Sequence, residues 1–247
     1  MKASNGASGG EHMDTKSNLL QRGRRVSPVE QGSLSARCYL ALRNALLDGS
    51  FRPGDRIVMR DVADMLGTSV TPIREACLRL VSEFALEIRS RRFIHVPDVT
   101  LRRYEQLKVL RTSLEGLAAK FAAEKITKSR IAQLRKIHVA YVSAEAERRV
   151  QEAFRSNREF HLGVCEAAGL DMLYNHIEML WVSMSPILVV YYGEITLKHL
   201  GGEEHVNLLD ALERRDGAAA QRAMRRDIEL GSDSILDHLA ALDALSD

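Results

Sequence analysis

The stretch "TSVTPIREACLRL" (Thr68–Leu80) places a short polar run and a proline in front of an amphipathic pattern that carries two arginines. Thr71 can cap a helix here, and Pro72 suits its first position, because the first N–H groups of a helix have no partner within it. Four apolar positions are expected to face a core: Ile73, Cys77, Leu78 and Leu80. The stretch therefore predicts a helix whose leading turns are polar and uncovered.

Two further helices are expected before it. An apolar stripe from Leu34 to Leu46 predicts a helix that ends at Gly49. The stretch "RDVADMLG" predicts a shorter helix that ends at Gly67. Its inward positions are Val62, Ala63 and Leu66. About four residues, one of them glycine, link this short helix to the proline-started helix, and that spacing is typical of a helix-turn-helix.

A hairpin is expected after the three helices. The stretch "ALEIRSRRFIHVP" predicts strands at about Leu86–Arg89 and Phe93–Val96, joined by the basic tip Ser90–Arg92. Three helices followed by a hairpin predict a winged helix-turn-helix domain over residues 32–97. Residues 1–31 have little apolar periodicity and predict a flexible leader.

Residues 98–247 show helical patterns and no strand signal. One apolar stripe recurs at intervals of three and four residues and is expected to be the core face of a long first helix: Leu107, Leu110, Leu114, Leu117 and Phe121. Five more amphipathic helices are expected, at about 129–149, 152–168, 170–197, 202–212 and 216–242. The fold class is therefore mainly α, with an N-terminal winged helix-turn-helix and a C-terminal all-α helical bundle.

Charge and cysteine usage narrow the class of protein. Residues 1–97 hold 15 basic and 10 acidic residues, a net charge of +5, whereas residues 98–247 hold 20 and 23, a net charge of −3. The basic excess therefore lies in the part expected to bind DNA. Three scattered cysteines are too few for a disulfide framework and favour a cytoplasmic location. No apolar run reaches the ~20 residues of a membrane span, so no membrane partner is expected.

The leading turns of the second helix in a helix-turn-helix enter the major groove of DNA. We therefore expect Ser69, Thr71 and Arg74 to contact bases or nearby phosphates. Phosphate contacts are expected from four other residues: Arg60, Arg91, Arg92 and His95. The alternative is a small helical subdomain whose arginines serve only solubility, and the full order of elements favours DNA.

The stretch "LALRNALLDGSFRPGDRIVMRDVADMLGTSVTPIREACLRL" (residues 40–80) resembles the winged-helix domain of the GntR family of bacterial transcriptional regulators. The resemblance covers about Ser35–Val96. The family typically shows a "G-x-x-x-P-G" turn, an "L-A-x-x-L-G" helix and an "S-R-T-P-V-R-E-A-L" recognition element, which correspond here to "GSFRPG", "VADMLG" and "SVTPIREAC". The resemblance implies that Arg60 and Arg74 contact DNA and that Thr71 and Pro72 start the recognition helix.

Two departures from the family pattern concern the proposed DNA contacts. Val70 stands where the family usually has arginine, and Phe93 where its wing usually has glycine. A bidentate arginine–guanine contact is worth about 1–3 kcal/mol of base discrimination. The operator is therefore expected to differ from the sequence common in the family, with Arg74 as the chief reader.

A second group of residues has the chemistry of metal ligands. In "NREFH", Asn157 and His161 are four residues apart and lie on one helical face. His205 and Asp227 each lie near inward apolar residues of later helices, so the bundle can bring these side chains together. From the residues alone, the alternative of surface or hydrogen-bonded core groups stays open.

Residues 98–247 are similar to the effector (FCD) domain of the FadR-like subfamily. Its patterns "R-x-x-L-E", "D-x-x-F-H", "E-H" and "A-x-x-A-M-x-x-H" correspond here to "RTSLE", "NREFH", "EEH" and "AAAQRAMRRD". The similarity implies a divalent metal bound by four residues: Asn157, His161, His205 and Asp227. It also implies a small organic acid as effector, which occupies the open coordination positions of the metal. Asn157 stands where the subfamily usually has Asp, and Asp227 stands where it usually has the last His. We therefore expect weaker binding of Zn, Ni or Mn.

Arg111 matches the first arginine of the effector domain and is expected to pair with the effector carboxylate. A buried ion pair with a helix glutamate is the alternative for this residue. Four other histidines match no ligand position and are expected to be ordinary: His138, His176, His199 and His238.

These expectations describe a cytoplasmic, homodimeric repressor of transcription rather than an enzyme. It binds double-stranded operator DNA and responds to a small acid. The first alternative is a metal-dependent enzyme of the helical-bundle type, although no nucleophile motif and no base at a telling spacing accompany the proposed ligands. The second is an interaction module that has lost DNA binding, suggested by Val70 and Phe93.

Overall fold

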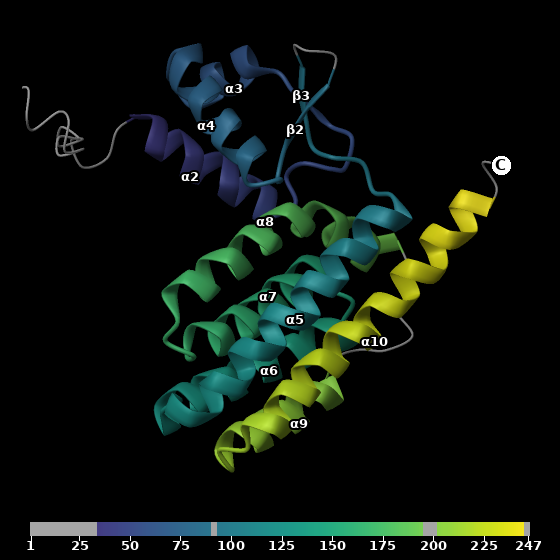
Figure 1. Ribbon diagram of the computed structural model, residues 1–247. Coiled ribbons are helices and arrows are strands. Elements are labelled where there is room, and N and C mark those ends of the chain that lie inside the picture. The colour runs from purple at the N-terminus through teal and green to yellow at the C-terminus, as the bar shows by residue number, and fades with distance from the viewer. Residues whose placement is uncertain (1–33, 90–92, 195–201, 245–247) are drawn as a thin grey trace, which may run out of the picture. The chain divides into compact units, whose positions relative to one another are not determined.

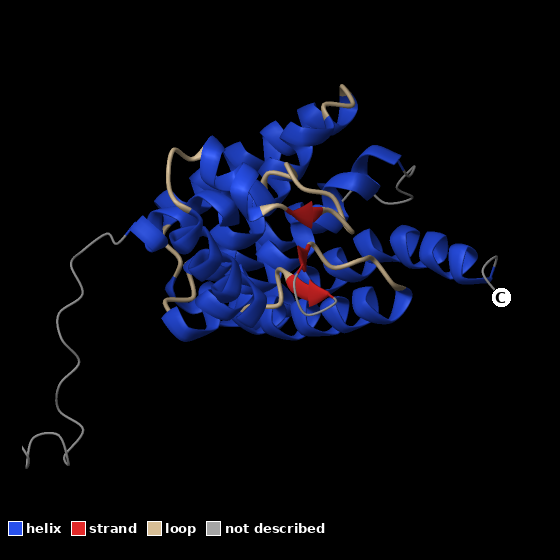
Figure 2. Ribbon diagram, turned by 90° about the horizontal axis from the view of Figure 1, so that it is seen from above, coloured by secondary structure: helices blue, strands red, loops and turns tan. Residues whose placement is uncertain are grey.

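A computed structural model describes residues 34–89, 93–194 and 202–244, which belong to one compact unit, Leu34–Asp247. The expected leader 1–31 and the wing arginines Arg91 and Arg92 lie outside the described residues. The described chain is mainly helical, and its strands gather in one small sheet (Figure 2).

The N-terminal part has the winged-helix order (Figure 1). Its helices are α2 (Leu34–Leu47), α3 (Met59–Met65) and α4 (Val70–Ser82). Its strands are β1 (Arg56–Ile57), β2 (Glu87–Arg89) and β3 (Phe93–His95), which form an antiparallel sheet in the order β1-β3-β2. Strand β1 was not expected, because two residues are too short to show an alternating pattern.

The start of α4 differs from the expectation. Ser69 is the N-cap residue and makes no side-chain capping bond, so the assignment of Thr71 as N-cap was wrong. Leu78 was expected in the core but is 47% exposed. At 100° per residue, Leu78 lies about 140° around the helix from buried Ile73. Leu66, at the end of α3, was also expected inward and is 42% exposed. A short surface helix packs against its neighbours on one side only, so apolar residues on its other sides stay in contact with solvent.

The end of α4 is tied to two helices of the bundle. Phe84 follows the helix in the left-handed conformation, with φ of 59°. Its carbonyl accepts hydrogen bonds from Nη2 of Arg103 and from Oγ of Ser183, each at 2.8 Å. The carboxyl end of α4 is therefore anchored to the helices that carry Arg103 and Ser183.

The bundle contains the six helices expected from the sequence. They are α5 (Leu101–Lys125), α6 (Lys128–Ala146), α7 (Val150–Glu166), α8 (Asp171–Glu194), α9 (Gly202–Glu213) and α10 (Gly217–Ala244). Threonine hydroxyls cap two of them, because Thr100 accepts from the Arg103 amide and Thr127 from the Arg130 amide. Helices α5 and α10 run beside each other (Figure 1).

The buried face of α5 matches the expected stripe only in part. Leu107 is buried, and Leu114 and Phe121 are half-buried and pack against the core, but Leu110 is 46% and Leu117 37% exposed, so the prediction was wrong for these two leucines. The buried side also includes polar and small residues: Tyr104, Arg111, Thr112, Glu115, Gly116, Ala118, Ala119, Ala122 and Ala123. Small residues let a neighbouring helix approach closely. A β-carbon added to Gly116 would lie only 2.7 Å from Cγ of Arg225 on α10.

Candidate functional site

The leading turns of α4 are open to solvent. Ser69, Thr71 and Arg74 are all exposed, and Arg60 is exposed on the first turn of α3. Buried residues on the opposite side of α4, including Ile73 and Leu80, hold the helix on its neighbours. These four polar side chains are therefore accessible to a DNA duplex.

The sheet carries a further cation that the sequence analysis did not single out. The guanidinium of Arg56 stacks on the ring of Phe93, 3.7 Å from its centroid. His95 is half-buried, and its Nδ1 lies 3.2 Å from the carbonyl oxygen of Gly54, so its ring is attached to the sheet. Arg56 was missed because no pattern in the sequence places it opposite the wing.

The structure brings the proposed metal ligands together inside the bundle. His161 on α7, His205 on α9 and Asp227 on α10 are 1%, 0% and 7% exposed, and one ligand atom from each lies within 4.8 Å of the others. Asn157 lies one turn before His161 and is also buried. Asn157, His161 and Asp227 line a small cavity of about 30 Å³, together with Arg111. Residues 70 positions apart in the sequence therefore meet at one site.

Both histidines turn the same ring nitrogen toward Asp227. In His161, Nδ1 lies 2.9 Å from Oε2 of Glu115, and Nε2 lies 2.9 Å from Oδ2 of Asp227. In His205, Nδ1 lies 3.4 Å from Nδ1 of His138, and Nε2 lies 3.7 Å from Oδ1 of Asp227. Neither Nε2 atom has a well-aligned hydrogen bond to another described residue, although both are buried.

These buried nitrogens fit a bound cation. A buried polar atom without a partner costs about 1–3 kcal/mol. Two imidazole nitrogens, a carboxylate and a neighbouring amide form a ligand set that suits Zn, Ni or Mn. A cation could be held by the two Nε2 atoms and the carboxylate of Asp227, which lie within 4.8 Å of one another.

Glu115 and His138 contact the Nδ1 atoms of His161 and His205, respectively. The sequence analysis did not select either of them as a site residue. A partner on Nδ1 leaves Nε2 as the atom offered to a metal, and such partners commonly orient metal-binding histidines. The signal for Glu115 was its spacing from Arg111 in "RTSLE". No sequence signal links His138 to His205, because 67 positions separate them.

Arg111 adopts the ion pair that was its alternative assignment. Its Nε lies 2.5 Å from Oε1 of Glu115, and its guanidinium stacks 4.2 Å from the ring centroid of Trp181. It also lines the cavity beside Asp227. Arg111 is therefore positioned both to hold Glu115 and to face a molecule that enters the cavity.

Burial and pairing shift the pKa values of this cluster in opposite directions. Burial lowers the pKa of His205 to about 3, so its imidazole is neutral. Burial also acts to lower the pKa of His161, but Asp227 and Glu115 outweigh it and raise that pKa. Burial acts to raise the pKa of Glu115, but Arg111 and His161 lower it overall. The cluster therefore holds ionised carboxylates without exposure to water.

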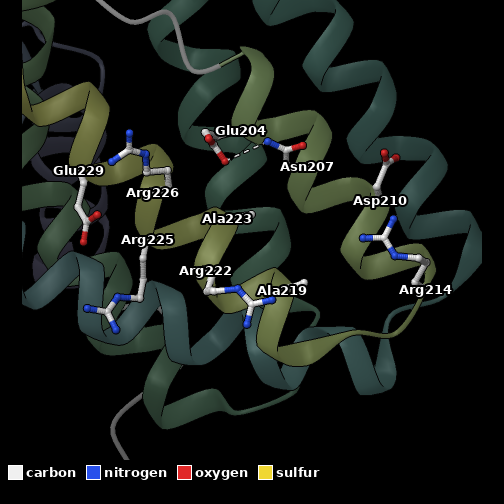
Figure 3. Close-up of a pocket in the computed structure, with 10 residues that line it drawn as sticks. All are labelled: Glu204, Asn207, Asp210, Arg214, Ala219, Arg222, Ala223, Arg225, Arg226 and Glu229. Atoms are coloured by element: carbon white, nitrogen blue, oxygen red, sulfur yellow. Dashed lines mark hydrogen bonds between the residues drawn. The ribbon is translucent and has the colours of Figure 1, made fainter.

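A second, more open hollow of about 620 Å³ lies over α9 and α10 (Figure 3). It is lined by arginines and acidic residues, among them Arg214, Arg222, Arg225, Arg226, Glu204, Asp210 and Glu229. The guanidinium groups point in different directions in Figure 3 and do not converge on one point. We assign no site to this hollow.

Two family matches together span most of the described chain. Residues 34–96 match bacterial regulatory proteins of the gntR family, and residues 106–230 match the FCD domain. The chain belongs to the GntR family. It is a DNA-binding transcriptional regulator with an FCD domain, as the motifs indicated.

Characterised relatives of this GntR-family protein are also regulators. The chain is 32% identical to the HTH-type transcriptional regulator McbR of Escherichia coli K12 over 188 residues, which cover 74% of this chain and 84% of the relative. It is 24% identical to the HTH-type transcriptional repressor RspR of the same organism over 211 residues, 85% of this chain and 90% of the relative.

Solved structures agree on the fold. That of E. coli McbR/YncC matches with a TM-score of 0.75 at 30% identity, over 84% of this chain and 99% of the other. A GntR regulator from Rhodococcus sp. RHA1 matches with a TM-score of 0.69 at 19% identity, over 85% and 99%. The relatives are regulators and not enzymes, which favours the regulator over the metalloenzyme. No described helix of this protein meets the length and hydropathy needed to cross a membrane.

Proposed function

We propose that this GntR-family regulator is a cytoplasmic, homodimeric repressor that leaves its operator when a small organic acid binds in the bundle. Residues 32–97 bind DNA, and residues 98–247 bind the effector and join the two copies. The observation that carries the proposal is the exposed polar start of α4 in the same chain as a buried cluster of metal-ligand side chains.

In this proposal Arg74 reads a base while Ser69 and Thr71 fix the position of α4 in the groove. Arg60 contacts phosphate from the start of α3. The wing residues Arg91, Arg92 and His95 add phosphate contacts from the hairpin. Arg56, held on Phe93, is well placed to join them.

The metal site consists of His161, His205 and Asp227, with Asn157 as a neutral fourth ligand. With neutral imidazoles, the guanidinium of Arg111 and the carboxylates of Glu115 and Asp227 leave a net charge of −1. A bound divalent ion of Zn, Ni or Mn would reverse this sign and would supply a Lewis acid for an oxygen ligand. Arg111 lines the same cavity and can bind the carboxylate of an acid there.

The size of the cavity makes effector binding a conformational event. About 30 Å³ holds on the order of two water molecules and no organic acid. An acid therefore binds only to a more open bundle and shifts the population toward that packing. Because α5 and α8 also anchor the carbonyl of Phe84, their movement reaches the end of α4.

Fluorescence anisotropy on DNA from the gene's own promoter tests the proposal. We expect nanomolar binding that weakens with salt and exceeds binding to random DNA by at least about 1,000-fold. A promoter–reporter assay should show higher expression when the gene is deleted, as expected for a repressor. Equal affinity for promoter and random DNA would overturn operator recognition, and lower expression in the deletion would overturn repression.

A further inference from the structure

The cavity beside the proposed metal ligands has one lining residue that solvent reaches. Of the ten described residues that line it, nine are buried and Gly231 alone is half-buried. Gly231 lies on α10 four residues, or about one turn, after Asp227, so both residues are on the side of the helix that faces the cavity. A molecule that arrives from solvent therefore meets the cavity first at Gly231.

Packing between helices does not explain this glycine. Gly231 lies in the interior of α10, where glycine stabilises a helix less than alanine does. Other helical glycines have close neighbours: a β-carbon added to Gly116, Gly163 or Gly217 would lie 2.7, 2.9 or 2.8 Å from an atom of another helix. At Gly231, no described atom outside its own stretch of helix backbone lies within 4 Å of that position. The missing side chain therefore leaves space at the cavity rather than room for another helix.

The backbone of α10 can also bend at this point. The hydroxyl of Ser232, the next residue, donates to the carbonyl oxygen of Ile228 at 2.6 Å. Serine hydrogen bonds to the carbonyl four residues earlier tend to bend helices, and Gly–Ser pairs are common sites of kinks. A cavity of about 30 Å³ must widen before an acid enters, and α10 can yield at the residue that faces solvent.

The lining of the cavity has a charged part and an apolar part. Arg111 and the proposed metal ligands form the charged part. Two aliphatic side chains and two tyrosines supply most of the remainder: Leu188, Ile228, Tyr104 and Tyr141. The hydroxyl protons of Ser232 and Tyr141 are already donated, to Ile228 and to Glu145, so neither is free for a ligand. This part of the lining therefore suits an apolar chain better than a hydroxylated one.

We infer that Gly231 is the mouth of the effector cavity, and that the effector is an aliphatic monocarboxylate whose chain lies beside this glycine. The carboxylate lies toward Arg111, and the chain occupies the space that a side chain at position 231 would fill. This inference rests on the acid effector of the proposed function and specifies its entry point and its chemical class.

Carboxylates of increasing length test the chemical class. In calorimetric titrations of the zinc-loaded full chain, each added methylene should tighten binding about fourfold, so butyrate should bind about 15-fold more tightly than acetate. The matched acid 3,4-dihydroxybutyrate has the same carbon chain. It should bind more weakly than butyrate, because its hydroxyls would leave water without finding free donors. Equal or tighter binding of the hydroxylated acid overturns the aliphatic class.

Substitutions at Gly231 test the mouth. Gly231→Ala should raise the melting temperature, because alanine favours a helix and its β-carbon meets no other side chain. The same methyl group should weaken butyrate binding about fourfold, the contribution of one displaced methylene. A merely structural glycine would not combine higher stability with weaker binding.

A larger side chain should close the mouth. Gly231→Leu should abolish butyrate binding and slow the release of zinc to excess chelator. The equilibrium affinity for zinc should stay unchanged, since position 231 supplies no ligand atom. Gly193→Ala is the matched control, because Gly193 is an exposed glycine of α8 outside the cavity lining, with 3.9 Å between its added β-carbon and Val150. Circular dichroism confirms that each variant is folded.

The outcomes separate the mouth from the proposed function. Equal butyrate affinity in the wild type and a folded Gly231→Leu variant overturns the mouth and leaves the acid effector intact. Unchanged zinc release in that variant overturns the mouth whatever the effector is. If the zinc-loaded wild type binds none of these acids, the aliphatic effector is overturned, while promoter anisotropy still tests operator binding separately.

Discussion

Helices α4 and α5 both show an apolar periodic pattern, yet they bury different kinds of residue. In α4, most of the apolar stripe is buried and the arginine of the leading turns is exposed. In α5, two leucines of the stripe, Leu110 and Leu117, are 46% and 37% exposed, whereas Arg111 and Glu115 are buried. The comparison teaches that apolar periodicity locates a helix, but does not by itself identify the side that faces its own core.

The largest effect is expected from breaking the buried ion pair of α5. Glu115→Ala should lower the free energy of unfolding by about 3–5 kcal/mol, because it leaves the Arg111 guanidinium buried without its partner. Urea denaturation of the metal-free protein measures this change. Glu105→Ala, at an exposed position of the same helix, is the control and should stay within about 0.5 kcal/mol.

A double variant sharpens this prediction. Arg111→Met combined with Glu115→Leu removes both charges and should recover most of the stability lost in Glu115→Ala. If Glu115→Ala alone is as stable as the wild type, the polar interior assigned to α5 is wrong.

The next effect concerns the exposed side of α4. Arg74→Ala should weaken operator binding by about 1–3 kcal/mol and relax the preference for one base pair. Anisotropy with operators substituted at single positions measures both effects. Arg222→Ala on α10 removes the same charge at a site away from α4 and should leave the preference unchanged. An unaltered base preference in Arg74→Ala would show that another side chain reads the operator.

A smaller effect on metal affinity is expected from His138, which contacts the ligand His205. His138→Phe should reduce metal affinity about tenfold, because Nδ1 of His205 loses the partner that turns Nε2 toward Asp227. Competition with a chromogenic chelator measures this affinity. His176→Phe is the control, because His176 is exposed on α8. Equal losses in both variants would point to a general effect on the bundle.

The smallest effect is a pH dependence of the metal-free protein. The folded pKa of His161 is raised above its ordinary 6.5 by Asp227 and Glu115, which outweigh burial. Its contribution to stability is therefore fully present below pH 6.5 and is lost as the pH rises through the folded pKa. Thermal unfolding in chelator should show a falling melting temperature over this interval. The fall should be reduced in His161→Gln, and an identical profile in that variant would contradict the assignment.

Much of the fold follows from local patterns. The winged helix and the six bundle helices were placed from periodicity, glycine, proline and caps, because these signals act within a few residues. The errors lie where contacts between distant elements decide. Strand β1 exists because β3 offers it hydrogen bonds, and Leu78 is exposed because no neighbour covers that side of α4.

The candidate site divides in the same way. His161, His205 and Asp227 were chosen through a resemblance to family motifs, and the fold brings them within 4.8 Å. Glu115 and His138 were not chosen, because their roles depend on which nitrogen of a neighbouring ring they contact. Such a contact exists only after α5, α6, α7 and α9 have packed.

The amino-acid sequence by itself determined which segments are helical, the polar start of the recognition helix and the supply of ligand atoms. Each of these depends only on residues that are close together in the sequence. Tertiary structure alone decided which side of α5 is buried and how the two imidazoles are turned. The physical reason is that burial and hydrogen-bond direction depend on partners supplied by other helices. Among these, the close approach of α10 buries α5 at Gly116, while Leu110 and Leu117 stay exposed.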